Sequence, residues 1–126
     1  MNIPNDLKYT KDHEWARIEG DNAVIGITDY AQSELGDIVY VDLPSVGDKF
    51  KQNDTFGTIE AVKAAADLFC PLAGEIIEIN ENVADNPETI NKDPYGDGWM
   101  IKLKLEDESA LAELMDSSAY QAEIGD

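Results

Sequence analysis

A single lysine stands out because it lies among small side chains in a sequence with few basic residues. Lys63 lies within residues 56–67, with alanines after it and strand-forming residues on both sides. Small neighbours leave the lysine amine open to an enzyme that modifies it covalently. The competing interpretation is a helix over residues 61–66, because alanine is the strongest helix former. The flanking strand-like runs, and Phe-Cys-Pro at 69–71, favour a hairpin tip instead.

The charge of the sequence excludes some classes of partner. Among 126 residues, 27 are Asp or Glu and 9 are Lys or Arg, which gives a formal net charge of −18. Nucleic acids and anionic membranes attract basic surfaces, so we expect neither as a partner. Two interpretations of the acidity stay open. It serves solubility alone, or it directs fast, salt-sensitive docking onto basic partner surfaces.

One cysteine and one histidine limit the redox and metal chemistry of the chain. Cys70 has no partner for an internal disulfide, and with His13 it supplies too few soft ligands for a structural zinc site, so we expect no metal. No basic residue adjoins Cys70 in sequence, so we expect a buried, unreactive thiol. No apolar run approaches the roughly 18 residues of a membrane span, and residues 1–8 lack a targeting pattern. We therefore expect a cytoplasmic protein, ahead of a processed mitochondrial form.

The first half of the sequence predicts strands around one short helix. Residues 13–27 carry Trp, Ile and Val on both sides of a polar turn, which predicts two strands. Thr28 stands where a helix N-cap would stand, and Gly36 closes a helix of two turns. Residues 37–43 have apolar side chains at both alternating sets of positions. We expect a strand there that is buried on much of both faces.

The second half predicts further strands and a helical end. Residues 74–80 form a clear strand, with Ile77 and Ile79 predicted to point inward. Residues 85–98 are polar and contain Pro and Gly, which is typical of a long loop with one helical turn. Residues 99–105 alternate again and predict the last strand.

A weak internal repeat supports two packed halves. Residues 36–41 match residues 74–79 in their glycine, acidic and β-branched positions. We predict one domain over residues 1–126, with a β body over about 8–105 and a C-terminal helical segment over about 107–124. The expected fold is mainly β, a flattened barrel or sandwich of two small sheets with short peripheral helices and a C-terminal helix.

Several blocks of the sequence, in the right order, resemble the H protein of the glycine cleavage system. The similarity extends from Tyr9 to about Tyr120, nearly the whole chain. The blocks are YTKDHEW (9–15), GITDYAQ (26–32), LGDIV (35–39) and GTIEAVKAAAD (57–67), then Pro71, Gly74, Asn80, Asn91, DPY (93–95) and GW (98–99). Agreement across separate blocks makes the match specific, which Val-Lys-Ala alone would not be.

This resemblance implies a biotinyl/lipoyl-type fold and a carrier, with no catalytic residue of its own. Lys63 would be joined by an amide to lipoate, through a lipoate ligase or transferase that recognises Glu60, Val62 and Ala64 around it. The lipoyl arm would accept an aminomethyl group from glycine decarboxylase and deliver it to aminomethyltransferase. Dihydrolipoyl dehydrogenase would then reoxidise the arm. Tethering gives the arm a high effective concentration at each active site.

The resemblance also implies a cleft, near the first strand and the lysine hairpin, that protects the loaded arm. An aminomethyl adduct is labile to water and carries a cationic amine, so exclusion of water and nearby carboxylates would preserve it. Our candidates are Glu14 and Asp67, with Asp12 and His13 as weaker ones. For each acid, the alternative is an ordinary solvated carboxylate.

Two departures from the family pattern and several rival functions stay open. Ala61 stands where the family usually has Ser, and Cys70 where Ala or Ser is common. A biotinyl carrier would have methionines beside the lysine, and a lipoyl domain of a 2-oxoacid dehydrogenase normally adjoins Ala/Pro-rich linkers. A lipoyl relay that donates lipoate to other enzymes is not separable by sequence. From another class, the chain could be an unmodified interaction module.

Overall fold

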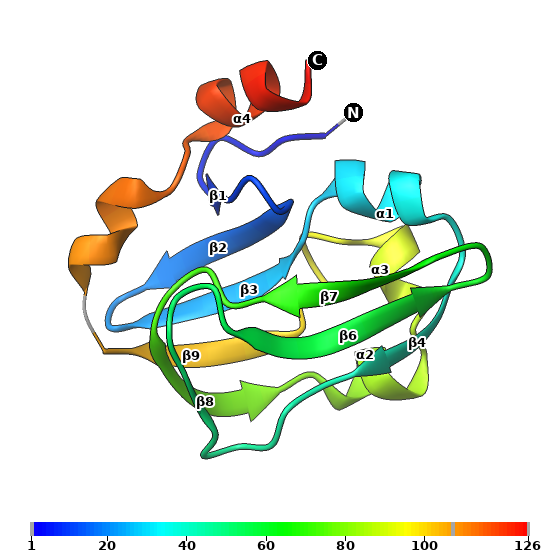
Figure 1. Ribbon diagram of the computed structural model, residues 1–126, viewed down its shortest axis with the longest axis horizontal. Helices are drawn as coiled ribbons and strands as arrows, with labels where there is room; N and C mark the ends of the chain where they lie inside the picture. The colour runs from blue at the N-terminus through cyan, green and yellow to red at the C-terminus, as the bar shows by residue number, and fades with distance from the viewer. Residues whose placement is uncertain (1, 107, 126) are drawn as a thin grey trace.

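Two β-sheets pack face to face in the computed structural model, which describes residues 2–106 and 108–125 (Figure 1). The larger sheet has the order β1 (Lys8–Tyr9), β2 (Glu14–Glu19), β3 (Asn22–Ile27), β9 (Ile101–Leu105), β8 (Gly74–Ile79) and β5 (Lys49–Phe50). The smaller sheet has the order β4 (Ile38–Asp42), β6 (Thr55–Ala61) and β7 (Ala65–Phe69). All pairings within the sheets are antiparallel.

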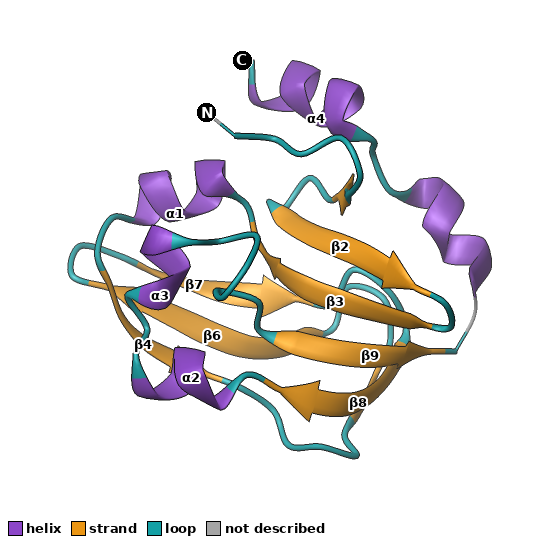
Figure 2. Cartoon of the chain, turned by 180° about the vertical axis from the view of Figure 1, so that it is seen from behind, coloured by secondary structure: helices purple, strands orange, loops and turns teal. Residues whose placement is uncertain are grey.

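Short helices surround the sheets, as Figure 2 shows from behind. They are α1 (Asp29–Leu35), α2 (Glu81–Asp85), α3 (Thr89–Lys92), the 3-10 helix η1 (Glu108–Glu113) and α4 (Ser117–Ile124). The predicted mainly β fold with two sheets, short helices and a C-terminal helix is confirmed, as a sandwich rather than a closed barrel. Among the described strands, no pairing closes the two sheets into a barrel. Residue 107, where the predicted helical segment starts, lies outside the described residues.

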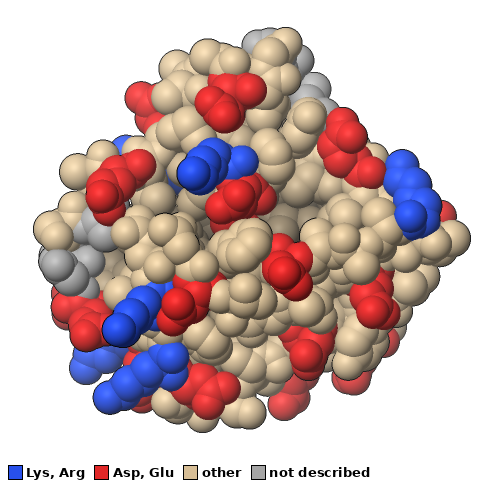
Figure 3. Space-filling view, in the orientation of Figure 1, with Lys and Arg blue, Asp and Glu red and all other residues tan. Residues whose placement is uncertain are grey.

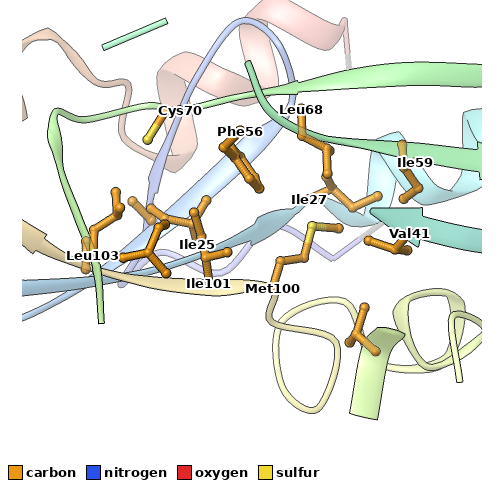
Figure 4. Packing of buried hydrophobic residues seen from close by; sticks show 14 of the residues in the cluster. Ile25, Ile27, Val41, Phe56, Ile59, Leu68, Cys70, Met100, Ile101 and Leu103 are labelled. Atoms are coloured by element: carbon orange, nitrogen blue, oxygen red, sulfur yellow. The ribbon is translucent and has the colours of Figure 1, made fainter. Parts of the chain in front are cut away.

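The core lies between the two sheets and follows the two-residue period of the strands. In Figure 4, Phe56 and Leu68 of the smaller sheet point toward Ile25, Ile27 and Met100 of the larger sheet's layer. All five side chains are buried. Each such burial contributes roughly 1.5–3 kcal/mol, so this layer holds the β6–β7 hairpin against the larger sheet.

A second apolar cluster lies on the other face of the larger sheet, under the C-terminal helix. It contains Leu7, Tyr9, Trp15, Val24 and Tyr120, all buried. The Tyr9 and Tyr120 rings stack with centroids 4.8 Å apart. Figures 1 and 2 show α4 and the N-terminal segment side by side over β1 and β2. The C-terminal helix therefore completes the burial of the strands that carry the candidate site.

Helix α1 begins and ends where the sequence predicts. The Thr28 hydroxyl accepts a hydrogen bond from the Ala31 N–H, and the Gly36 N–H donates to the Gln32 carbonyl. Gly36 has φ +79° and ψ −152°, a backbone conformation that is almost restricted to glycine. Asn91 then donates to the Gly36 carbonyl and accepts from the Ile38 N–H, which fixes the path from α1 into β4.

Two predictions about which strand residues point inward are wrong, and β-bulges are the reason. β4 is an edge strand with a register shift between Ile38 and Tyr40. Val39 and Tyr40 are 55% and 50% exposed, so the strand is not buried on both faces. Ile77 is 38% exposed, whereas Ile79 packs against the core as predicted, because a register shift between Ile76 and Glu78 puts the two isoleucines on different faces. An extra residue in a strand moves the following side chains to the opposite face.

Candidate functional site

Lys63 lies at the tip of the β6–β7 hairpin, which extends past the helices in Figure 1. The Ala61 N–H donates to the Ala64 carbonyl, and the Val62 N–H donates to the Asp37 carbonyl. These bonds close the turn and tie it to the chain just before β4. The predicted hairpin is confirmed and the alanine-rich helix is wrong, because β7 pairs along its length with β6. Tertiary pairing thus overrides the helix propensity of alanine.

The Lys63 side chain is exposed, and so are its predicted recognition neighbours. Val62 is 77% exposed, and Glu60 and Ala64 are exposed as well. The aliphatic part of Lys63 lies on Gly36, where an added Cβ would come within 3.2 Å of the lysine Cε. The amine is therefore open to solvent, and the residues around it are presented on the surface.

A cleft of about 270 Å³ lies between α1, the start of β2 and the hairpin. The lining residues are Asp12, His13, Glu14, Ile27, Tyr30, Ala31, Glu34, Leu35, Ile59, Ala66, Asp67 and Leu68. The structure thus brings together the four residues predicted for the arm pocket, Asp12, His13, Glu14 and Asp67. Figure 3 shows this side of the molecule hollowed near its middle, with acidic side chains beside the hollow.

Glu14 is a buried carboxyl group in the cleft, with only 2% of the residue exposed. Burial raises its pKa to about 8, although hydrogen bonds from Thr10 and Phe69 act in the opposite direction. The Thr10 hydroxyl donates to Oε1 at 2.8 Å, and the Phe69 N–H lies 3.4 Å from Oε2. Burial therefore favours the neutral acid at Glu14 more than it would at an exposed glutamate.

His13 lies at the edge of the cleft in a constrained backbone conformation. Its φ is +68°, in the left-handed region that His adopts more readily than most residues. Its Nδ1 lies 2.9 Å from the Tyr120 hydroxyl, and its ring contacts Tyr30. Burial lowers the pKa of His13, while the charges of Asp12, Glu123 and Glu34 act to raise it.

Sequence reasoning missed the contribution of α1 to the cleft. Tyr30, Ala31, Glu34 and Leu35 form one face of this helix, because residues four apart lie one above the other. The signal was present, since the helix and its N-cap are predicted from the sequence. What the sequence lacked was the direction in which this face points. Tyr120, which contacts His13, lies 107 residues away in the chain and had no local signal.

Cys70 is not among the residues that line the cleft. Cys70 is buried and its thiol donates to the Leu72 carbonyl at 3.1 Å. The expected burial of Cys70 is confirmed, and burial raises the pKa of its thiol to about 12. The described residues contain no group of His, Cys, Asp and Glu that could hold a metal ion. None of the helices in the described part of the chain is long and apolar enough to cross a membrane.

Comparison with known proteins agrees with this arrangement along the whole chain. A family model described as "Glycine cleavage H-protein" matches residues 7–126. The glycine cleavage system H protein of Bacteroides thetaiotaomicron is 60% identical over 124 residues, covering 98% of each chain. That of Chlorobium limicola is 55% identical over 128 residues, covering 100% of each.

A solved structure shows the same fold. The crystal structure of a glycine cleavage system H protein from Mycobacterium marinum matches with a TM-score of 0.90 and 40% sequence identity. The match covers 98% of this chain and 99% of that chain. On sequence and structure together, the chain belongs to the glycine cleavage H-protein family.

Proposed function

We propose that this chain is a lipoyl carrier of glycine cleavage, with lipoate attached to Lys63. The observation that carries the proposal is an exposed lysine on a fixed hairpin tip next to an acid-lined cleft. Membership of the H-protein family supports the carrier role. The residues present fit the group, because the amine is open and its neighbours Val62 and Ala64 are exposed.

The proposed partners are the enzymes that a carrier of this kind serves in turn. They are glycine decarboxylase, aminomethyltransferase and dihydrolipoyl dehydrogenase, together with the lipoate ligase or transferase that modifies Lys63. Attached lipoate supplies a disulfide that can take up an aminomethyl group and a dithiol that can be reoxidised. The chain itself is proposed as a non-catalytic subunit. Its buried, unpaired Cys70 fits a reducing compartment such as the cytoplasm.

In this function the cleft accepts a cationic amine and excludes water from it. Asp12 and Asp67 lie at the cleft as carboxyl groups of an acidic protein, and they attract a positive charge. Glu14 is poised differently, because burial has raised its pKa to about 8. A cation close to Glu14 favours its ionised form, so entry of the amine releases a proton. The resulting charge pair is shielded from water.

The outer face of the smaller sheet is proposed as the surface that partners recognise. Tyr40 of β4 pairs with Glu60 of β6, and Asp42 lies on the same face two residues further along β4. Together with Val62 at the tip they form an exposed apolar and acidic surface, which we call the docking face. Such a surface fits an apolar channel mouth with a basic rim.

The decisive experiment is intact-mass measurement after incubation with lipoate, ATP and a lipoate ligase, followed by peptide mapping. We expect one lipoyl increment, on the peptide that contains Lys63. The Lys63→Arg variant should gain no increment. The Lys51→Arg variant, which changes another exposed lysine, is its matched control and should be modified normally. A protein that gains no increment, or gains it elsewhere, would overturn the assignment of Lys63.

The second stage of the test asks whether the lipoylated protein works with the proposed partner enzymes. Lipoylated protein should restore glycine cleavage to a mixture of glycine decarboxylase, aminomethyltransferase and dihydrolipoyl dehydrogenase. Unmodified protein in the same mixture is the control. If Lys63 is lipoylated but glycine cleavage is not restored, the assignment of a lipoyl carrier stands and the proposed partners are rejected.

A further inference from the structure

Tyr120 of the C-terminal helix contacts two segments that form the cleft, the loop before β2 and the start of α1. Its hydroxyl lies 2.9 Å from His13 Nδ1 and 2.8 Å from Thr28 Oγ1. His13 belongs to the loop before β2, and Thr28 caps α1, which supplies other lining residues of the cleft. The backbones of these two residues are also joined, since the Thr28 N–H donates to the His13 carbonyl at 3.0 Å.

The direction of the hydrogen bonds along this chain of groups follows from the donors available. Thr28 Oγ1 accepts from the Ala31 N–H at 3.2 Å. Among the described residues, the other hydrogen-bond partner of this buried oxygen is the Tyr120 hydroxyl. Either oxygen of the Thr28–Tyr120 pair can donate by geometry, and the arrangement that gives the buried Thr28 proton a partner among the described residues has Thr28 donating to Tyr120 and Tyr120 donating to His13 Nδ1. A neutral imidazole that accepts at Nδ1 carries its proton on Nε2.

We propose that Tyr120 is a positioning residue of the cleft, whose hydroxyl holds His13 neutral, with its proton on Nε2, and fastens it to the start of α1. Its consequence for the carrier rests on the proposed function. A protonated His13 would place a positive charge where a cationic amine must enter. A neutral His13 leaves the charge of the cleft to the carboxyl groups, so the amine is held longer.

The groups that face His13 would otherwise favour its protonation. Asp12 lies beside it in the same loop, Glu34 lies on α1 and Glu123 lies on α4, and each of these charges raises the pKa of His13. Tyr30 contacts the ring through its own ring. Burial has the larger, opposite effect and lowers this pKa. A hydrogen bond donated to Nδ1 acts in the same direction as burial, because it stabilises the neutral form alone.

The chain suits a direct test because it has a single histidine. In protein labelled with ¹⁵N-histidine, we expect NMR to show one neutral tautomer, protonated at Nε2. This measurement uses the wild-type protein, so it determines the His13 tautomer even if a substitution prevents folding. A wild-type protein with the proton on Nδ1 would overturn the proposal.

The matched variants are Tyr120→Phe and Tyr95→Phe. The Tyr95 hydroxyl accepts from the Asp29 N–H and donates to the Asn2 carbonyl, so it also holds the start of α1, without contact to His13. We expect Tyr120→Phe to give a mixture of tautomers and an upward shift of the His13 pKa. Tyr95→Phe should change neither. The same tautomer and titration in Tyr120→Phe as in wild type would contradict the proposal.

A second experiment tests the consequence for the carrier. It measures how fast loaded, lipoylated protein loses its amine near neutral pH. Loss of one buried hydrogen bond corresponds to a roughly two- to tenfold faster release in Tyr120→Phe, with wild-type behaviour in Tyr95→Phe. An unchanged release rate would reject the role of Tyr120 in holding the amine. Absence of lipoylation would instead reject the proposed function, and the NMR result would still stand.

Discussion

The tip of the β6–β7 hairpin and the floor of the cleft beside that hairpin differ in burial. Val62 at the tip is 77% exposed, whereas Glu14 on the cleft floor is 2% exposed. Two backbone hydrogen bonds close the tip, and the side chains there are left to solvent. Around Glu14, by contrast, a hydroxyl and a backbone N–H both contact the carboxyl group.

This difference shows how one small domain separates attachment from protection. At the tip, side-chain chemistry stays ordinary because water surrounds it, which is what a modifying enzyme needs. On the cleft floor, burial changes the chemistry itself, since it raises the pKa of Glu14 to about 8. The comparison predicts that changes at the tip alter modification without altering stability. Changes at the floor should alter both stability and the fate of a bound amine.

The largest effect is expected for Lys63→Arg. Arginine keeps the charge but cannot form the amide, so lipoylation should be lost completely. Because the side chain is exposed, the free energy of unfolding should change by less than about 0.5 kcal/mol. Intact mass and urea unfolding measure the two quantities. A clear loss of stability would show that the tip is not independent of the fold.

A smaller but still large effect is expected for Glu14→Gln. The raised pKa means that wild-type stability falls as the pH rises from 4.5, where unfolded Glu titrates, to about 8, where folded Glu14 titrates. Glutamine cannot ionise, so this loss, on the order of a few kcal/mol, should disappear. Unfolding curves at several pH values measure it. Asp67→Asn, an exposed acid of the same cleft, should keep the wild-type slope.

The same two acids decide whether the cleft protects the arm. Glu14→Ala and Asp67→Ala should each speed the loss of amine from loaded carrier, by roughly tenfold or more for the buried acid. The measurement is the rate of amine release at fixed pH. If both variants release the amine at the wild-type rate, the pocket assignment fails.

A more modest effect is expected at Gly36, which contacts Lys63 at the hairpin tip. Its backbone conformation is almost restricted to glycine, so Gly36→Ala should destabilise the protein by about 1–3 kcal/mol. The contact with Lys63 is with the flexible part of that side chain, so it adds little. Gly20→Asn, at a left-handed turn with open space around it, should cost less. Equal losses from thermal unfolding of the two variants would contradict this ranking.

The smallest effect concerns the docking face. Raising the salt concentration from about 0.05 M to about 0.5 M should slow lipoylation and transfer severalfold, because screening shortens the range of charge attraction. Glu60→Gln should slow the reaction and reduce its salt dependence. The control Glu88→Gln changes an exposed acid outside the docking face. Rates that stay flat as salt rises would exclude electrostatic docking.

The sequence by itself determined the parts of this protein that depend on local pattern. Alternation and turn residues predict the strands on either side of Gly20, and Thr28 and Gly36 predict both ends of α1. The resemblance in separate blocks pointed to the family and to Lys63. These predictions succeed because backbone conformation at caps, turns and hairpins depends on a few neighbouring residues.

Tertiary structure alone decided the exposure of side chains and the chemistry of the cleft. The bulges in β4 and β8 turn Tyr40 and Ile77 toward solvent, and no local pattern reveals an extra residue in a ladder. The pKa of Glu14 is raised in the fold, because distant segments remove water from its carboxyl group. Tyr120 meets His13 across 107 residues of chain. A pKa and a tautomer are properties of the packed surroundings, and only the folded chain supplies them.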